Sequence, residues 1–187
     1  MGTLTITGGT LRSRRVPTPP GLAVRPTPAR VKEALFSILG ARVDAARVLD
    51  LFAGSGALGF ESLSRGAAHV TFIEKHRPTA DALRAAAREL GVAERCEVIA
   101  APAERAVRAV DGRYDLVFAD PPYALPYPAG VFGDLRARRA IDEGTTVVYE
   151  HSGHEPAPVD PAMRVERTER YGEVKLEFMR PLEAKAA

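Results

Sequence analysis

The sequence predicts an α/β fold with a mostly parallel sheet, and three features lead to this prediction. From Arg47 to His151, short apolar runs alternate with stretches of helical periodicity, as expected for a parallel sheet with helices on both faces. The first of these runs ends in a loop that contains two closely spaced glycines, Gly54 and Gly56. After a loop at 156–161, two strand-like runs follow each other with no helix between them. We therefore expect an antiparallel hairpin to close the sheet.

The N-terminal segment predicts a β-hairpin extension ahead of this fold. Apolar and polar residues alternate on both sides of Gly8-Gly9, and the second arm, Leu11–Val16, carries three arginines. The proline-rich stretch Pro17–Pro28 predicts an extended connector.

A helix is expected over Ala29–Leu39, where apolar side chains recur at helical spacing until Gly40 ends the pattern. Thr27 is placed to cap this helix, with Pro28 in its first turn.

The alternating region predicts five strands, four helices and the closing hairpin. The expected strands are Val48–Phe52, His69–Glu74, Glu97–Ala100, Tyr114–Ala119 and Thr145–His151. The expected helices are Ala57–Arg65, Thr79–Leu90, Ala103–Val110 and Gly130–Ala140. The hairpin is expected from Met163–Arg170 and Glu173–Met179.

The composition indicates a globular protein with one main domain. The 187 residues are 45% hydrophobic and 27% charged. We expect the main domain over 25–180, the hairpin extension over 1–24 and a flexible tail over 181–187. Cys96 is the only cysteine, which excludes an intrachain disulfide and a cysteine-based metal site, and we expect no metal. No apolar run approaches the ~20 residues of a membrane span. No secretory signal is recognisable either, so we expect a cytoplasmic protein without a membrane partner.

The distribution of charge is more informative than the net charge of +2. Basic residues gather in the N-terminal segment, where the only acid before Asp44 is Glu33. Such a cluster suits a phosphate-bearing partner. The alternative is an ordinary solvated surface.

A glycine fingerprint follows the first strand of the main domain. Gly54, Gly56 and Gly59 form the pattern Gly-x-Gly-x-x-Gly, which is typical of a dinucleotide-binding turn at the start of a helix. Glu74 lies about twenty residues further on, where an acid accepts hydrogen bonds from ribose hydroxyls. A purely structural turn is the alternative.

Three acids are expected at one edge of the sheet, because Asp50, Glu74 and Asp120 each end or follow a parallel strand. Repeated acids suit a cofactor with sulfonium and ammonium groups better than one with a pyrophosphate, which favours S-adenosylmethionine over NAD. Asp50 would bind the ammonium group, directly or through a water, unless it is only a helix or turn cap. The candidate cofactor-binding residues are Asp50, Phe52, Ala53, Gly54, Ser55, Gly56, Glu74, Lys75 and Asp120.

The more specific motif is Asp120-Pro121-Pro122-Tyr123. The two prolines stiffen the backbone and leave a rigid pair of acceptors, the Asp120 carboxylate and the Pro121 carbonyl. Such a pair can hold the two hydrogens of a planar exocyclic amine, and Tyr123 would stack on the base. The catalytic candidates are therefore Asp120, Pro121 and Tyr123. An ordinary loop that ends a strand is the alternative.

Together, the segments 50–56 and 120–123 resemble class I amino-methyltransferases that act on nucleobases. Three further segments are similar to the RsmD family, the 16S rRNA (guanine-N2)-methyltransferases of the small ribosomal subunit. These segments are Gly8-Gly9-x-Leu11-Arg12, Arg25-Pro26-Thr27-x-x-x-Val31-x-Glu33-Ala34-Leu35-Phe36 and Glu61–Ala67. The resemblance covers nearly the whole chain.

This resemblance implies a Rossmann-like methyltransferase with an N-terminal β-hairpin extension. It also implies methyl transfer from S-adenosylmethionine to N2 of one guanine of 16S rRNA, on an assembled or partly assembled small subunit. We expect a monomer. The basic residues expected to bind RNA phosphates are Arg12, Arg14, Arg25, Arg30 and Lys32.

The chain departs from the family pattern in one place. Many relatives have an acid near the end of the third strand that holds the adenine amine, whereas Ala100-Ala101-Pro102-Ala103 provides none. Backbone groups or Glu104 would take that role.

Three other functions compete with this interpretation. A DNA adenine-N6 methyltransferase shares the acid–proline–proline–aromatic motif, but no segment is long enough for a separate DNA-reading domain. An NAD-dependent dehydrogenase would explain the glycines and leave Asp120-Pro121-Pro122-Tyr123 unexplained. A non-catalytic RNA-binding module would need only the basic extension.

Overall fold

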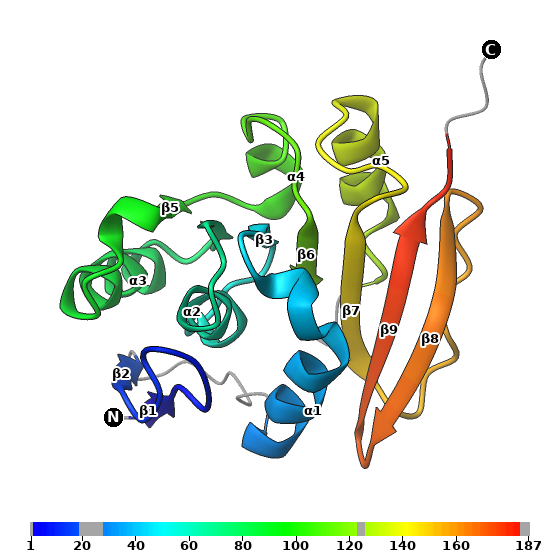
Figure 1. The fold of residues 1–187 in the computed structure, drawn as a ribbon. Coiled ribbons are helices and arrows are strands. Elements are labelled where there is room, and N and C mark those ends of the chain that lie inside the picture. Colours follow the sequence, from blue (N-terminus) through cyan, green and yellow to red (C-terminus); the bar gives the residue numbers. More distant parts are fainter. Residues whose placement is uncertain (1, 19–27, 123–125, 184–187) are drawn as a thin grey trace.

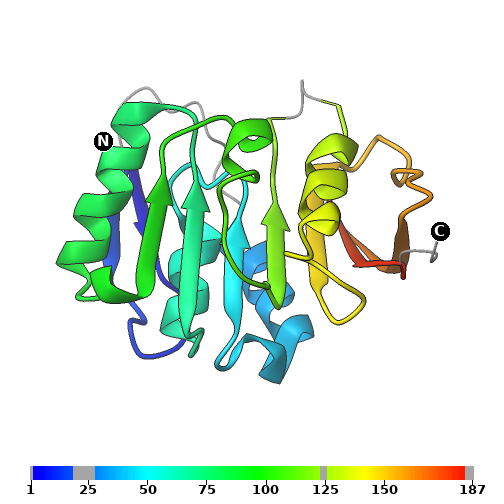
Figure 2. The same ribbon diagram turned by 90° about the horizontal axis from the view of Figure 1, so that it is seen from above.

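The computed structural model describes residues 2–18, 28–122 and 126–183, and its centre is a seven-stranded sheet (Figures 1 and 2). The strands are β3 (Arg47–Asp50), β4 (His69–Ile73), β5 (Cys96–Ile99), β6 (Leu116–Ala119), β7 (Thr146–Ser152), β8 (Met163–Tyr171) and β9 (Val174–Pro181). Their order in the sheet is β5-β4-β3-β6-β7-β9-β8. The strands from β5 to β7 are parallel, while β9 and β8 are antiparallel to their neighbours. The predicted parallel sheet with a closing hairpin is thus confirmed.

Helices cover both faces of the sheet, because successive residues of each strand point to opposite sides. The helices are α1 (Ala29–Leu39), α2 (Ala57–Ser64), α3 (Arg77–Glu89), α4 (Ala103–Ala106) and α5 (Ala129–Ala137). On β3, Val48 belongs to the core under α1, α2 and α3, whereas Leu49 belongs to the core under α4 and α5. The two helix layers lie on opposite sides of the sheet in Figure 1.

The element boundaries differ from the predicted ones by a few residues. Strand β3 ends at Asp50, so Phe52 lies in the turn that follows. Helix α4 ends at Ala106 instead of Val110, because the chain continues there in turns. The N-cap position of α1 is Pro28, and Thr27, the predicted cap, lies outside the described residues.

The N-terminal extension is a two-stranded antiparallel sheet of β1 (Gly2–Thr5) and β2 (Arg15–Thr18). The predicted hairpin is present, but its strands are joined by a connection over residues 6–14, longer than a turn at Gly8-Gly9, and this connection carries Arg12 and Arg14. The glycines serve contact with α2 instead. Gly9 has a φ of 76°, and a Cβ there would lie 1.8 Å from the Ser64 carbonyl oxygen. Only glycine permits this approach.

Among the described residues, no helix has the length and apolar character needed to cross a membrane.

Candidate active site at the carboxyl edge of the sheet

The candidate site lies where the winding of the sheet reverses. From β3 the chain turns to β4 on one side, and β6 pairs with β3 on the other side. Ligands of open α/β sheets bind beyond the carboxyl ends of the strands at such a point. The arrowheads of the parallel strands point to this edge, which is the upper one in Figure 2.

The glycine loop between β3 and α2 is tightly packed. Gly54 and Gly56 have φ angles of 50° and 77°, which other residues adopt at a cost. A Cβ on Gly59 would lie 2.1 Å from the ring of Phe72 on β4, so the third glycine allows α2 to approach the sheet. The backbone N–H of Gly54 donates to Glu74 Oε2 at 3.0 Å. The loop is thereby attached to the end of β4.

Asp50, the last residue of β3, is 3% exposed. Its Oδ2 accepts a hydrogen bond from the Gly59 N–H at 3.2 Å, so the capping contact with α2 exists. Burial raises the pKa of Asp50 to about 7, the bond from Gly59 opposes the rise, and the charge of Glu74 adds to it. A positively charged ligand would relieve this unfavourable burial. The Asp50 carboxylate is therefore a suitable acceptor for the ammonium group of a cofactor.

Glu74 follows β4 and is half-buried. Besides its bond from Gly54, its Oε1 accepts the His76 N–H at 2.7 Å. Two backbone donors thus fix the orientation of the carboxylate, and a carboxylate has acceptor positions left for a diol. Lys75 beside it is exposed.

Asp120 and Pro121 follow β6 at the same edge. Asp120 is partly exposed and Pro121 is buried. Burial of the carboxyl raises the pKa of Asp120 well above its ordinary value, and the charges of Glu150 and Asp50 raise it further. The third catalytic candidate, Tyr123, lies outside the described residues.

Glu150 is a further acid at this edge that the sequence analysis did not include among the candidates. It lies on β7 and is 5% exposed. The register pairs Ala119 of β6 with Tyr149 of β7, so the next residues along, Asp120 and Glu150, are neighbours. The signal was available, since Glu150 interrupts an apolar run near the end of a parallel strand, as the other acids do.

The predicted RNA-binding residues do not form one group. Arg12, Arg14 and Arg30 are exposed, whereas Arg25 lies outside the described residues. Lys32 is 1% exposed, its ammonium lies 3.1 Å from Glu61 Oε2, and it donates to the Thr5 carbonyl at 2.8 Å. The prediction that Lys32 binds RNA phosphates is therefore wrong. Lys32 forms a buried structural ion pair with Glu61.

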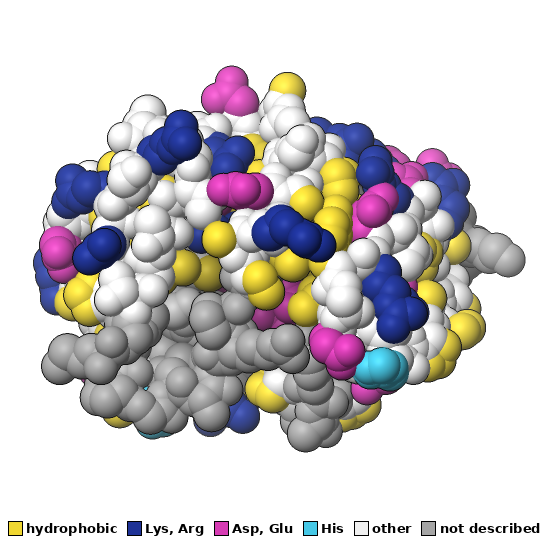
Figure 3. Space-filling model, turned by 90° about the horizontal axis from the view of Figure 1, so that it is seen from below, with side chains coloured by type: hydrophobic (Ala, Val, Ile, Leu, Met, Phe, Trp, Pro, Cys, Tyr) yellow, Lys and Arg dark blue, Asp and Glu magenta, His cyan; other side chains and the backbone are white. Residues whose placement is uncertain are grey.

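Arg12 and Arg14 lie far from the candidate-site acids Asp50, Glu74 and Asp120, at the opposite edge of the sheet. Their segment contacts the last residue of α2, where the Leu11 N–H donates to Ser64 Oγ, and Arg14 donates to the Glu89 carbonyl at the end of α3. Both helices end at the amino edge of the sheet, the lower edge in Figure 2. On the face shown in Figure 3, basic side chains are separated by acidic, hydrophobic and neutral ones, so no continuous basic patch is seen there.

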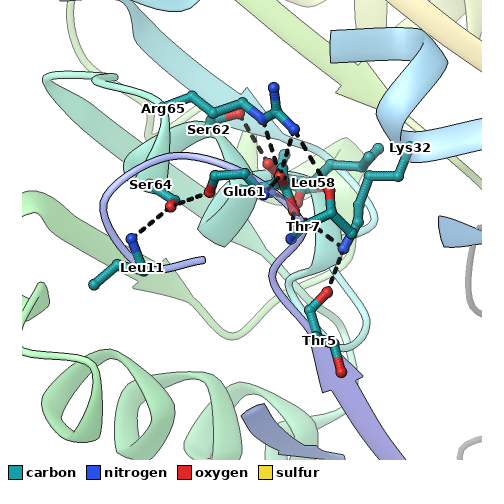
Figure 4. Close-up of polar contacts among 12 residues, drawn as sticks. Thr5, Thr7, Leu11, Lys32, Leu58, Glu61, Ser62, Ser64 and Arg65 are labelled. Atoms are coloured by element: carbon teal, nitrogen blue, oxygen red, sulfur yellow. Dashed lines mark hydrogen bonds and ion pairs between the residues drawn. The ribbon is translucent and has the colours of Figure 1, made fainter. Parts of the chain in front are cut away.

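Glu61 of α2 holds the extension in place (Figure 4). Its carboxylate accepts hydrogen bonds from the backbone N–H of Thr7 and of Gly8 and from the Thr7 hydroxyl, at 2.8 to 2.9 Å. Arg65 and Lys32 form ion pairs with it at 2.9 and 3.1 Å. We call these five residues the Glu61 cluster.

The extension also reaches the glycine loop. Val16 and Pro17 of β2 line one small hollow together with Gly54, Ser55 and Leu83. The extension therefore contributes to the surroundings of the predicted cofactor.

Comparisons with known proteins agree with this architecture. A structure described as a putative methyltransferase yhhF from Escherichia coli superposes with a TM-score of 0.85, at 32% identity, over 96% of this chain and 98% of that chain. The fold is therefore that of a class I, Rossmann-like methyltransferase.

Curated relatives have names of the same kind. The putative rRNA methyltransferase YlbH of Bacillus subtilis is 32% identical over 149 residues, which are 78% of this chain and 81% of that protein. The ribosomal RNA small subunit methyltransferase D of Escherichia coli is 39% identical over 122 residues, 65% of this chain and 61% of that protein. This second match thus spans less than two thirds of the relative.

The family model described as Conserved hypothetical protein 95 matches residues 4–180, which include the extension, the glycine loop and Asp120. The chain therefore belongs to this family, and the resemblance to the RsmD family is confirmed.

Proposed function

We propose that the protein transfers a methyl group from S-adenosylmethionine to the exocyclic N2 amine of a guanine in 16S rRNA. The observation that carries this proposal is the position of Asp120-Pro121, which follows β6 at the same sheet edge as the glycine loop after β3. The methyltransferase fold and the family membership support methylation of rRNA. The names of two relatives describe those proteins as rRNA methyltransferases.

The residues present suit this cofactor. S-adenosylmethionine supplies a methyl group on a positively charged sulfur. Asp50 would face its ammonium group and Glu74 its ribose hydroxyls, and the glycine loop, with Phe52 and Lys75 at its two sides, would surround the rest. Burial and the charge of Glu74 disfavour the ionised carboxylate of Asp50 and raise its pKa, and a bound cation would reverse that preference.

Asp120 would position the reacting amine. Its carboxylate accepts one N2 hydrogen, and the Pro121 carbonyl accepts the other, so that the nitrogen lone pair is directed at the methyl carbon. The N–C bond forms as the S–C bond breaks, and N2 then loses one proton. In its ionised form, a carboxylate whose pKa is raised is a stronger base than an ordinary one, so the ionised Asp120 is suited to take this proton. Tyr123 would stack on the base.

The substrate would be a guanine that leaves its stack in an RNA loop, at a lower cost than a paired base. Arg12, Arg14 and Arg30 would contact phosphates and position the enzyme on the small subunit, where it would act as a monomer. Because Arg12 and Arg14 lie at the opposite edge, their phosphates would be distant from the target.

The test is methyl transfer from labelled S-adenosylmethionine to small subunits that lack the modification, to free 16S rRNA and to duplex DNA. N2-methylguanine from the wild-type protein, and its loss in Asp120→Ala, would support the proposal. The matched control is Asp134→Ala, which removes from α5 a partly exposed carboxylate that pairs with Arg108. N6-methyladenine on DNA as the main product would overturn the proposal.

A further inference from the structure

The neighbour of Asp120 on the next strand is a buried acid, Glu150. β6 and β7 are parallel, with Phe118 opposite Val148 and Ala119 opposite Tyr149. One residue further, this register places Asp120 beside Glu150. Neighbouring strands in a sheet lie about 4.8 Å apart. Two carboxyl groups are therefore held side by side at the candidate site.

Both side chains point to the same face of the sheet. Phe118 and Val148 belong to the core under α1 and α2. Because side chains alternate along a strand, Asp120 and Glu150, each two residues further on, point to that face as well. Glu150 is only 5% exposed, and its charge acts on Asp120. The pair thus lies at the carboxyl ends of two neighbouring strands, with Glu150 inside β7 and Asp120 directly after β6.

The edge of guanine that carries N2 has two adjacent donors, the N2 amine and the N1–H. Adenine has only one amine on its corresponding edge, and its N1 is an acceptor. 2-Aminopurine keeps the N2 amine of guanine, but its N1 is also an acceptor without hydrogen. An ionised carboxylate only accepts hydrogen bonds, so it binds N1–H and repels an N1 lone pair. The two donors of guanine favour the ionised forms of two neighbouring carboxyl groups, so this pair matches guanine and rejects the other two bases.

We propose that Glu150 accepts the N1–H of the target guanine while Asp120 holds its N2 amine, which makes Glu150 the residue that determines specificity for guanine. This inference rests on the proposed function, because it assigns a role within the same reaction. It also explains how the acid–proline–proline–aromatic motif, which adenine methyltransferases share, is directed to a different base.

The experiment compares two substrates that differ at N1. A synthetic RNA segment carrying guanine or 2-aminopurine at the target position is ligated into 16S rRNA and assembled into small subunits. The measured quantity is the ratio of kcat/KM for guanine to that for 2-aminopurine, with the methylated nucleoside identified by mass spectrometry. In Glu150→Gln, this ratio should fall roughly 10- to 100-fold, as expected for loss of a hydrogen bond to a charged group. The glutamine amide accepts N1–H weakly and can donate to the N1 of 2-aminopurine, so activity on 2-aminopurine should rise.

The ratio separates specificity from stability, because a merely destabilised protein loses activity on both substrates equally. Glu177→Gln is the matched control. Glu177 is also fully buried and lies on the neighbouring strand β9, but it contacts His151 and Thr168. Its ratio should equal that of the wild type. Glu150→Ala should lower activity on guanine only.

Two outcomes count against the inference, and only one of them also overturns the proposed function. Normal methylation of guanine N2 with an unchanged ratio in both Glu150 variants would overturn the inference alone. Absence of N2-methylguanine from the wild-type protein would overturn the proposed function and the inference with it.

Discussion

Glu61 and the acids at the carboxyl edge of the sheet have opposite surroundings. Glu61 is fully buried, and burial raises its pKa, but the hydrogen bonds from Thr7 and Arg65 and the charge of Lys32 outweigh this effect and hold the pKa below its ordinary value. At the sheet edge, burial raises the pKa of Asp50 and of Asp120, and the neighbouring acids raise them further. One carboxylate has its donors and cations within the protein, while the others lie among like charges.

The difference distinguishes a structural acid from one that awaits a ligand. A buried charge whose donors and counter-ions are all present is satisfied in the folded protein. A group of acids that raise one another's pKa is unfavourable unless a ligand supplies the missing positive charge and donors. The first group joins the extension to the domain, and the second is the candidate active site. The following changes test this contrast, from the largest expected effect to the smallest.

Replacing Glu61 by alanine should lower the free energy of unfolding by about 3–5 kcal/mol, because it leaves the buried Lys32 ammonium without its partner. Urea unfolding measures this loss. The control Glu33→Ala removes an exposed acid from α1 and should change stability by less than about 0.5 kcal/mol. A similar stability for the two variants would show that the Glu61 cluster does not hold the extension.

Replacing Asp120 by alanine should lower activity without lowering stability, in contrast to the change at Glu61. We expect kcat to fall about 10²- to 10³-fold, as for the loss of a group that positions or stabilises the transition state. Stability should remain equal or increase, because a carboxylate is removed from beside Glu150 and Asp50. Single-turnover methylation and urea unfolding of the same preparation give both values, and a clear loss of stability would contradict the contrast with Glu61.

The pH dependence of stability should reveal the raised pKa of Asp50. Its pKa of about 7 in the folded protein lies above the ordinary value of 3.8, so the ionised carboxylate costs stability above about pH 7. As the pH falls from about 7 to about 4, the folded protein takes up the proton first and this cost disappears. Asp50→Asn, which keeps an acceptor for the Gly59 N–H, should therefore raise Tm at about pH 8 and leave it unchanged near pH 4.

The contribution of Glu61 to stability should depend on pH in the opposite direction, and it serves as the comparison for Asp50. Its pKa lies below the ordinary 4.5, so its contribution is present above about that pH and is lost as the pH falls further. If Asp50→Asn had the same effect on Tm at both pH values, the raised pKa of Asp50 would be refuted.

The smallest effect concerns RNA. Each of Arg12→Ala and Arg14→Ala should lower the slope of log affinity against log salt concentration by about 0.7 to 0.9, if each contacts one phosphate. Filter binding at several salt concentrations measures the slope. Arg113→Ala is the control, since this exposed arginine already pairs with Asp115 and Asp142. Equal slopes for all three variants would remove Arg12 and Arg14 from the RNA interface.

Most of the fold followed from the sequence, because the pattern of apolar residues is local. Helix α1 has the predicted bounds, and each predicted strand of the main sheet is present within a few residues. The glycine loop and Asp120 lie at one edge as expected, because the carboxyl ends of parallel strands meet there. Contacts between distant segments were not predictable in this way.

Lys32 illustrates this limit. Its partners, Thr5 and Glu61, come from two other elements, and nothing in the spacing of the sequence distinguishes it from a solvated lysine. The path of residues 6–14 was missed for the same reason, since it depends on contacts with Ser64 and Glu61. Glu150 was missed although its position near the end of a strand was recognisable.

The attachment of the extension through Glu61 has a consequence for any shortened form of this protein. Removing the first 18 residues would delete the donors of Thr7 and Gly8 and the Thr5 carbonyl that binds Lys32. It would also expose the apolar surface now covered by Leu4, Ile6 and Val16. The arm and the catalytic core should therefore unfold in one cooperative transition, and trimming the arm should impair the core as well.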